Sequence, residues 1–413
     1  MSSSTSTVAP VPDATELEAA LRAMAAGRFV VLADDRVDPP RGALAVAAEA
    51  TSADAVNVLA SEARGVVCVG LSGARLDVLG IGLLPRSDPD AVAFTVSVEA
   101  AEGVSTGIST ADRARTVAVL IDPTATLADL VSPGHIFPIR VHPGGVLANA
   151  GFAEAACDLT RLAGVASGAA VFAEVLGPDG EVATASELDA LATRLGAPLI
   201  PTSALVRHRM ARECHVRRLE SGRVPTRFGD LDVTVWENLL DGEQHLLLQH
   251  GTLAPPADQP APLVRLHSQC LTGDVFHSLR CDCGPQLDAA MARILAEPNG
   301  ALLYLRQEGR GIGLVSKLRA YALQDRGRDT VEANEELGFK ADARDYGIGA
   351  QILTQAGVHR VRILTNNPRK VSGLAAFGIQ VEGREALQTT PVPENTRYLQ
   401  AKKHKLGHLL DGV

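Results

Sequence analysis

The sequence predicts two domains, an α/β domain followed by a mixed α+β domain, and three observations support this fold class. The chain has 413 residues, whereas one domain takes roughly 150. Short valine-rich runs alternate with alanine- and leucine-rich helical patterns through the first half. The charge balance then changes: residues 1–200 hold 24 acidic residues against 12 arginines and no lysine, whereas residues 201–413 hold 24 against 27 basic residues.

The first domain follows an aperiodic stretch, residues 1–12, which we expect to be a loose end. The apolar face of residues 17–24 predicts a helix, and the next apolar run predicts a strand at 29–32. Further valine-rich runs predict strands, and an alanine- and leucine-rich pattern predicts a helix at 187–194. The further strands are expected at 65–70, 92–98 and 116–121.

A connector is expected at residues 201–215, where proline, arginine, cysteine and histidine replace the earlier pattern. We therefore place the first domain at 13–206 and the second at 207–413. The second begins with strands at 231–236, 244–249 and 263–267. It continues with helices at 286–295, 315–325 and 343–356, and with strands at 301–305 and 361–364. The basic residues 402–405 are expected to be a solvated helix end.

Composition and charge narrow the classes of function. No uncharged stretch reaches the roughly 18 residues of a membrane span, and the first positive charge, Arg22, comes too late for a secretory signal. We expect a cytoplasmic protein with no membrane partner. The chain has only 9 Phe, 4 Tyr and 1 Trp, and its basic residues are dispersed, so we expect no nucleic-acid partner. A phosphate-bearing ligand is favoured by the second half and repelled by the first.

Three of the six cysteines crowd together at Cys270, Cys281 and Cys283. Thiolates at this spacing can share one ion, and zinc held by three protein ligands keeps its fourth position for a catalytic water. Two alternatives stay open: three reduced, buried cysteines without a metal, and a structural zinc with His267 or His277 as its fourth ligand, which fits the spacing equally well.

The sequence around these cysteines, Arg265-Leu-His-Ser-Gln-Cys270 through Arg280-Cys-Asp-Cys283-Gly, resembles the zinc-binding signature of GTP cyclohydrolase II. The resemblance extends in the family's order over nearly all of residues 209–385. It includes blocks such as Gln307-Glu-Gly-Arg-Gly-Ile-Gly313, Asp342-Ala-Arg-Asp-Tyr346 and Thr365-Asn-Asn-Pro-Arg-Lys370.

The resemblance implies roles for individual residues. The zinc ligands are Cys270, Cys281 and Cys283; the nucleophile is Arg344; the proton acceptor is Asp342; and Tyr321 orients the base or its water. The implied GTP-binding residues are Arg265, Leu266, His267, Ser268, Gln269, Gln286, Glu308, Gly309, Arg310, Thr330, Thr365 and Lys370.

The implied reaction is the first step of riboflavin biosynthesis, the hydrolysis of GTP by a homodimer with Zn²⁺ at the cysteines and Mg²⁺ at the phosphates. Its products are 2,5-diamino-6-(5-phosphoribosylamino)pyrimidin-4(3H)-one, formate and pyrophosphate. Two positions depart from the family, which usually has Glu at Gln269 and often Gly at His277. We expect the loss of charge at Gln269 to alter substrate affinity or base recognition.

Residues 13–208 resemble 3,4-dihydroxy-2-butanone 4-phosphate synthase, which is often fused ahead of GTP cyclohydrolase II. Matching segments include Gly107-Ile-Ser-Thr-Ala-Asp-Arg-Ala114, Pro133-Gly-His-Ile-Phe-Pro138 and Pro143-Gly-Gly-Val-Leu147. Other residues of the family's site persist, namely Cys68, Thr106, His135, Glu154 and Glu174.

The residues that bind the synthase's divalent metal are replaced. Pro39 occupies the position of the family's metal-binding glutamate, and Phe152 that of its metal-binding histidine. Four nearby positions also differ. The family has an arginine, a second glutamate, a final aspartate and a threonine where this sequence has Asp38, Arg41, Ala43 and Ala153, respectively. Since neither Pro nor Phe offers an oxygen or imidazole ligand, we expect an inactive first domain. Two alternatives stay open: a bifunctional enzyme with relocated metal ligands, and a protein that binds GTP without hydrolysing it.

Overall fold

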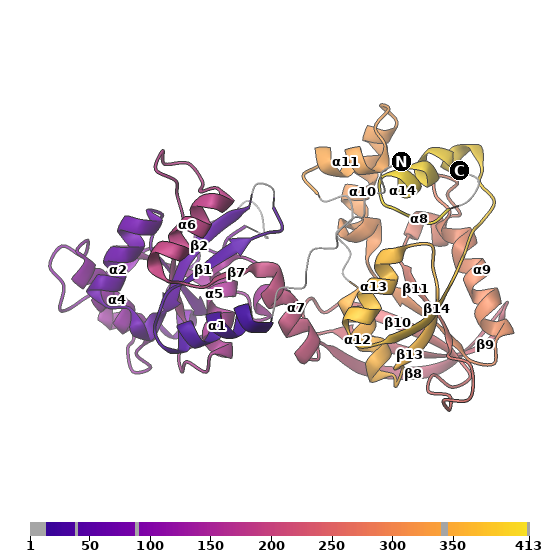
Figure 1. Ribbon diagram of the computed structural model, residues 1–413, viewed down its shortest axis with the longest axis horizontal. Helices are drawn as coiled ribbons and strands as arrows, with labels where there is room; N and C mark the ends of the chain where they lie inside the picture. Colours follow the sequence, from indigo (N-terminus) through magenta and orange to yellow (C-terminus); the bar gives the residue numbers. More distant parts are fainter. Residues whose placement is uncertain (1–13, 38–39, 87–90, 340–345, 411–413) are drawn as a thin grey trace. The chain divides into compact units, whose positions relative to one another are not determined.

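The computed structural model describes residues 14–37, 40–86, 91–339 and 346–410, and it divides the chain into two units, Met1–Arg212 and Glu213–Val413 (Figure 1). Both units are mixed α/β structures built on one sheet each, as the sequence predicts. The expected boundary after residue 206 falls within helix α7 (Thr202–Arg212). Among the described helices, none combines the length and the apolar composition needed to cross a bilayer.

The first unit is a seven-stranded mixed sheet in the order β4-β5-β3-β6-β2-β1-β7. Its strands are β1 (Val30–Asp34), β2 (Arg41–Ala47), β3 (Cys68–Ser72), β4 (Val98–Ala100), β5 (Leu130–Val141), β6 (Ala170–Glu174) and β7 (Leu199–Pro201). The β1–β7 and β3–β5 pairs are parallel and the others antiparallel.

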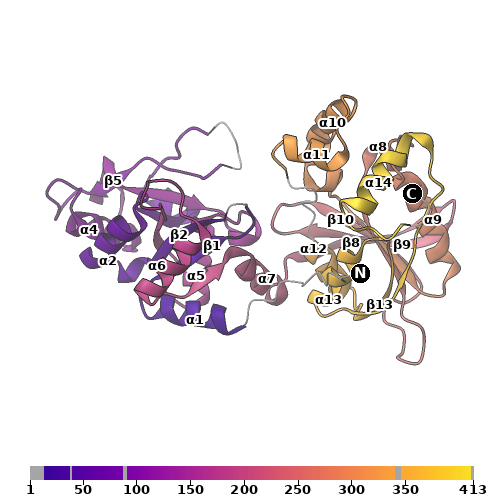
Figure 2. The same ribbon diagram turned by 45° about the horizontal axis from the view of Figure 1, so that its top comes forward.

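Helices cover both faces of this sheet, because side chains alternate between the faces along each strand. Val31 and Leu44 pack into one core with helices α2 (Ala53–Val58), α4 (Thr110–Ile121) and α6 (Ala185–Leu195). Their neighbours Val30 and Ala43 pack into a second core with α1 (Ala14–Ala25), α5 (Phe152–Leu162) and α7. A short helix, α3 (Gly73–Val78), follows β3. Figure 2 shows the helices on either side of the strands.

Two strand predictions in this unit are wrong. Residues 116–121 lie in α4, whose N-cap Ser109 accepts a hydrogen bond from the Asp112 amide at 3.1 Å. The β-branched residues of this run, such as Thr116 and Val117, are buried in the core, and this burial outweighs their preference for strands. Of residues 92–98, only Val98 lies in a named strand.

The expected connector at residues 201–215 is also wrong, because most of it is helix α7. Arg209, on this helix, is buried and pairs with Asp158 of α5 at 2.5 Å. The arginines that suggested a solvated linker therefore include one that fixes the helix to the domain.

The second unit is a seven-stranded sheet in the order β14-β13-β11-β12-β10-β9-β8. Its strands are β8 (Val216–Thr226), β9 (Gly229–Asn238), β10 (Gln244–His250), β11 (Leu263–Ser268), β12 (Gly300–Leu305), β13 (Arg360–Leu364) and β14 (Gln380–Glu385). The strands β8, β9, β10 and β12 pair antiparallel, whereas β12, β11, β13 and β14 are parallel.

This unit has seven α-helices among the described residues, three of which correspond to the helices predicted at 286–295, 315–325 and 343–356. The seven are α8 (Leu271–Asp274), α9 (Cys283–Ala296), α10 (Gly313–Gln324), α11 (Thr330–Glu336), α12 (Gly347–Gln355), α13 (Pro368–Ala376) and α14 (Thr396–His404). Of the helix expected at 343–356, residues 343–345 lie outside the described residues. The parallel strands β11, β12 and β13 end at the same edge of the sheet, where loops converge to form a ligand site in open α/β sheets.

Candidate active site

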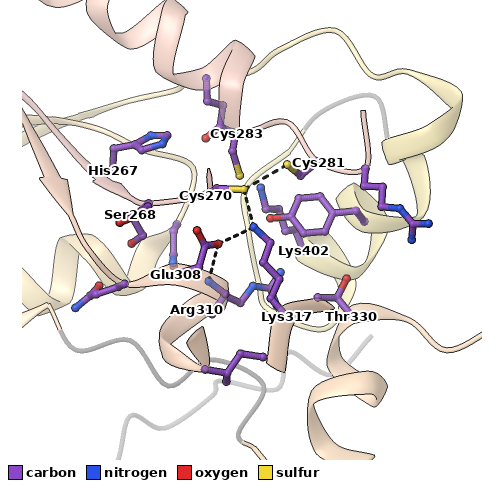
Figure 3. A pocket seen from close by; sticks show the side chains of 18 of the residues that line it. His267, Ser268, Cys270, Cys281, Cys283, Glu308, Arg310, Lys317, Thr330 and Lys402 are labelled. Carbon is purple, nitrogen blue, oxygen red and sulfur yellow. Dashed lines mark hydrogen bonds and ion pairs between the residues drawn. The ribbon is translucent and has the colours of Figure 1, made fainter. Parts of the chain in front are cut away.

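A cavity of about 120 Å³ lies at this edge of the sheet. Residues that directly follow the three parallel strands line it, including Gln269 after β11, Gln307 after β12 and Thr365 after β13. Helices α9, α10, α11, α13 and α14 also contribute to the wall, together with the turn at residues 308–312. The cysteines and the implied nucleotide-binding residues therefore belong to one cavity (Figure 3).

Three cysteine sulfurs meet at one end of the cavity. The sulfurs of Cys270, Cys281 and Cys283 all lie within 4.8 Å of one another, and the Cys270 and Cys281 sulfurs are 3.7 Å apart (Figure 3). Zinc–sulfur bonds of about 2.3 Å at tetrahedral angles would place two sulfurs about 3.8 Å apart. The cluster has the spacing and the thiolate chemistry that a tetrahedral, thiophilic ion requires.

The turn that carries Cys270 is organised by the carboxylate of Asp274, whose side chain is only 2% exposed. This carboxylate accepts hydrogen bonds from the Cys270 amide at 2.9 Å, from the Tyr304 hydroxyl at 2.8 Å and from His267 Nε2 at 3.1 Å. Gly273 makes the close approach possible, since a β-carbon there would lie 2.8 Å from the Cys281 sulfur.

His267 does not contribute to the sulfur cluster. Burial lowers its pKa, so the imidazole is neutral and its Nε2 proton is directed to Asp274. Among the described residues, the only group of three or more possible metal ligands consists of the three cysteines, without His267 or His277. This geometry favours the open, three-ligand arrangement over the closed one.

Cys270 carries negative charge in this cluster. Its pKa lies well below its usual range because the neighbouring Cys281 and Cys283 thiols donate to its sulfur and Lys317 lies beside it. Lys317 Nζ is 3.1 Å from this sulfur and 2.6 Å from Glu308 Oε1. Burial lowers the Lys317 pKa, but these two anions outweigh it, so the lysine is charged.

Two polar atoms at the cavity are buried without a partner in the part of the chain that the structure describes. They are His267 Nδ1 and Ser268 Oγ, both at the end of β11. A buried polar atom that pairs with nothing in the protein is costly, so such atoms suit hydrogen bonding to a ligand. These atoms therefore suit the cavity to a polar ligand.

Cations line another part of the cavity. Arg265 is buried and donates to the Leu364 carbonyl at 3.0 Å, and Lys370 donates to the Leu266 carbonyl at 2.7 Å. Arg310 stands on a backbone with φ 65°, in a tight turn after Gly309 at φ 62°. These cations give the cavity a positive wall that suits phosphate groups.

The structure brings together nearly all the residues that the resemblance assigned to GTP. Every one of them lines the cavity except Leu266, whose side chain is buried and whose carbonyl instead accepts from Lys370. Tyr321 also lines it, with its hydroxyl 3.2 Å from Thr272 Oγ1. Asp342 and Arg344 lie outside the described residues.

Several lining residues were not recognised from the sequence. They are Arg280, Gln307, Ile312, Lys317, Ala320, Gln324, Asn334, Asn366, Asn367, Tyr398, Lys402 and His408. Lys317 and Asn366 occur within the blocks that resemble the family, so their proximity to assigned residues was a usable signal. The expectation that residues 402–405 form a solvated end is wrong for Lys402, which is 9% exposed.

The first unit has its own cavity, of about 530 Å³. Cys68, Glu154 and Glu174 line it, but Thr106 and His135 do not. Glu154 is buried, and burial raises its pKa. His135 instead contacts Glu99, at 2.9 Å.

The substituted positions change the charge and polarity of this cavity. Arg41 lies 3.7 Å from the Asp34 carboxylate, which also pairs with Arg36 at 2.8 Å. The Arg41 guanidinium lies 6.0 Å from the ring of Phe152, which also lines the cavity. Pro39 and Asp38 are outside the described residues. At Phe152 and Arg41, an aromatic ring and a cation therefore stand where the resemblance expects a histidine and a carboxylate.

Comparisons with known proteins also divide the chain into two domains. Residues 217–386 match the GTP cyclohydrolase II family, and residues 18–208 match the 3,4-dihydroxy-2-butanone 4-phosphate synthase family. The chain is 46% identical to riboflavin biosynthesis protein RibBA of Synechocystis sp. over 398 residues, 95% of this chain and 71% of the relative. It is 45% identical to RibBA of Mycobacterium tuberculosis over 404 residues, 96% of this chain and 95% of the relative.

One solved structure is similar over most of the chain. It is the crystal structure of RibBX from A. baumannii, described as a two-domain 3,4-dihydroxy-2-butanone 4-phosphate synthase. The TM-score is 0.69 at 29% identity, and the match covers 90% of this chain and 99% of the other.

Proposed function

Because the chain belongs to the family of riboflavin biosynthesis proteins that join a 3,4-dihydroxy-2-butanone 4-phosphate synthase domain to a GTP cyclohydrolase II domain, we propose that its second unit is a zinc-dependent enzyme acting in the cavity at Cys270. GTP is the substrate of GTP cyclohydrolase II, a hydrolase. The products proposed are 2,5-diamino-6-(5-phosphoribosylamino)pyrimidin-4(3H)-one, formate and pyrophosphate. The observation that carries the proposal is the three-sulfur cluster within a cation-lined cavity.

The phosphates of GTP are met by Arg310, Lys370 and Arg265, with Mg²⁺ at the pyrophosphate. His267 Nδ1 and Ser268 Oγ offer hydrogen-bonding atoms at the end of β11. Gln269 stands where the family usually has a glutamate, so base recognition here relies on an amide instead of a carboxylate. The assembly proposed is a homodimer, and size-exclusion chromatography with light scattering measures it directly.

Cys270, Cys281 and Cys283 would hold the zinc, which would supply a water acidified toward neutral pH for opening the imidazole ring at C8. Lys317 balances the charge of the thiolates from the side of Cys270. Tyr321 orients the base or its water through its hydroxyl, whose pKa is raised by burial. C8 leaves as formate.

Release of pyrophosphate is assigned to Arg344, with Asp342 as its base, on the resemblance alone. A guanidinium is protonated in water and is a nucleophile only after a base takes its proton. Attack of the Arg344 nitrogen on the α-phosphorus forms a P–N bond and breaks the bond from the α-phosphorus to the bridging oxygen, which departs with pyrophosphate. Water then cleaves the P–N bond, which releases the 5-phosphate of the product and restores Arg344. Asp342, two residues away in sequence, accepts the guanidinium proton.

For the first unit we propose loss of the metal-dependent synthase reaction. Phe152 offers no ligand atom, and Arg41 adds a cation to the cavity in place of a carboxylate. A divalent cation prefers oxygen or imidazole ligands and is repelled by a guanidinium. A second candidate, an active synthase with relocated ligands, is favoured by membership in a family whose members are bifunctional.

The test of the second unit uses the full chain loaded with zinc and incubated with GTP and Mg²⁺, followed by mass spectrometry of the pyrimidine and by assays of formate and pyrophosphate. Cys283→Ala is expected to lose zinc and formate release together. Cys214→Ala is the matched control, since Cys214 is an exposed cysteine outside the cavity. GTP left intact by the zinc-loaded wild type would refute the proposal.

The test of the first unit uses the same protein with ribulose 5-phosphate and Mg²⁺ in the absence of GTP. We expect no 3,4-dihydroxy-2-butanone 4-phosphate. Its formation, together with its loss on Glu154→Ala and its persistence in Cys283→Ala, would establish the bifunctional alternative instead.

A further inference from the structure

The C-terminal segment covers the nucleotide cavity, although the match to the GTP cyclohydrolase II family ends at residue 386. Three of its residues line the cavity: Tyr398 and Lys402 of helix α14, and His408 just beyond it. Figure 3 shows Lys402 among the side chains around the cysteines. The wall of the site is therefore completed by a part of the chain to which no role has been assigned.

Lys402 forms a buried ion pair beside the sulfur cluster. Its Nζ lies 2.6 Å from Oδ1 of Asp282, and the two side chains are 11% and 2% exposed. Asp282 lies between Cys281 and Cys283 in sequence.

The ion pair begins a chain of buried hydrogen bonds that crosses the site. The other oxygen of Asp282 accepts from Gln286 Nε2 at 2.7 Å, and Gln286 Oε1 accepts from Arg265 Nη2 at 2.7 Å. Arg265 in turn donates to the Leu364 carbonyl at 3.0 Å. Each donor faces an acceptor, so the chain fixes which way the Gln286 amide points.

Tyr398 connects the same helix to the phosphate side of the cavity. Its ring lies 4.4 Å from Lys402 Nζ and 5.6 Å from the guanidinium carbon of Arg310. Both cations face an aromatic ring at distances where cation–π attraction operates. The helix thus contacts both Asp282, beside the cysteines, and Arg310.

The covering segment is fixed to the domain along α14 and just beyond the C-terminal end of this helix. Leu399 and Ala401 are buried, and the Leu409 amide donates to the Asn366 carbonyl at 2.9 Å. Lys405 Nζ lies 2.9 Å from Glu332 of α11. The position of Lys402 is therefore set by packing and hydrogen bonds along the segment.

We infer that Lys402 is a positioning residue for GTP: through Asp282 it orients Gln286 and Arg265 in the nucleotide site. The inference rests on the proposed function. Removing Lys402 leaves the buried Asp282 carboxylate without its cation beside Gln286, so the amide loses its fixed orientation and GTP binds less well. Direct contact of Lys402 with a reacting atom is not required.

The experiment compares Lys402→Met with Lys402→Arg and with Lys403→Met, whose residue is the neighbour on the same helix and is absent from the cavity wall. For Lys402→Met we expect binding of a non-hydrolysable GTP analogue to weaken about 10- to 100-fold, as for loss of a hydrogen bond to a charged group. Zinc content stays at the wild-type value. Lys402→Arg recovers most of the affinity, and Lys403→Met is unaffected.

A double-mutant cycle tests the route of the effect. If Lys402 acts through Gln286, the double variant Lys402→Met with Gln286→Ala binds the analogue no more than about threefold more weakly than the weaker-binding single variant. If the two residues act independently, the factors by which the single variants weaken binding multiply in the double variant. Melting followed by the fluorescence of Trp236, the single tryptophan, reports whether the second unit is folded.

The outcomes separate the inference from the proposed function. Unchanged analogue affinity in folded Lys402→Met, loss of zinc together with affinity, or fully multiplicative effects in the cycle would each overturn the positioning role. If Lys402→Met does not fold, Lys402→Arg and Asp282→Asn decide by the same measurements. A wild type that binds the analogue but releases no formate from GTP would refute the proposed function while the binding comparison still tests Lys402.

Discussion

Lys317 donates a hydrogen bond to the sulfur of Cys270 at 3.1 Å, and its ammonium also contacts Glu308 at 2.6 Å. If the cluster held a divalent ion, three thiolates would exceed the charge of that ion by one. A buried lysine on helix α10 is placed to compensate that excess. The charge balance of the cluster therefore depends on a residue 34 positions beyond Cys283 in sequence.

Replacing this lysine should weaken metal binding. We expect Lys317→Met to lower zinc affinity about 10- to 100-fold, because a hydrogen bond to a charged group contributes about 1.5–3 kcal/mol. Competition with a zinc chelator at neutral pH measures the effect. Arg319→Met, on the exposed face of the same helix, is the control. Equal affinities in the two variants would show that Lys317 does not stabilise the thiolates.

Gly273 leaves the space that the sulfurs occupy. A methyl group there would lie 2.8 Å from the Cys281 sulfur and 3.1 Å from the Cys270 sulfur, so Gly273→Ala must displace at least one ligand. We expect a loss of about 1–3 kcal/mol in stability and a zinc content well below one per chain. Gly222→Ala, where a β-carbon meets nothing within 4 Å, is the control. Full zinc occupancy in Gly273→Ala would contradict the geometry.

The Asp274 carboxylate has only acceptor atoms, and it faces donors from Cys270, Tyr304 and His267. In Asp274→Asn the amide places a donor against one of them, and we expect the second unit to lose about 1–3 kcal/mol of unfolding free energy. Urea unfolding of metal-free protein, followed by Trp236 fluorescence, measures this. Asp288→Asn breaks only an exposed pair with Arg227 and should cost less than about 1 kcal/mol.

Glu154 makes the stability of the first unit depend on pH. Burial raises its pKa in the folded protein, so its contribution is fully favourable below the ordinary glutamate pKa of about 4.3 and is lost as the pH rises through the raised value. Glu154→Gln keeps an acceptor for the His142 amide without the charge. Calorimetry should show a higher melting temperature for the variant at pH 7, with the difference shrinking toward pH 4. A lower melting temperature for Glu154→Gln than for the wild type at pH 7 would contradict this prediction.

Much of the second unit was predictable because its signals are local. The strand expected at residues 263–267 and the helix at 315–325 depend on apolar periodicity that a short window contains. The cysteine spacing likewise predicted a shared metal site, and the structure places those sulfurs together. The first unit was less predictable. Residues 116–121 include β-branched residues that are typical of strands, but they form part of a helix that is buried by residues distant in sequence.

The sequence by itself determined the two-domain α/β organisation and the close spacing of Cys270, Cys281 and Cys283, and it places Pro39 and Phe152 where the resemblance expects metal ligands. Only the tertiary structure decided that Lys317 neutralises the sulfurs and that Lys402, within a basic tail, is buried against Asp282. The reason is physical: periodicity and ligand spacing are properties of neighbouring residues, whereas a buried charge is tolerated only beside its partner. That partner is found once the chain has folded.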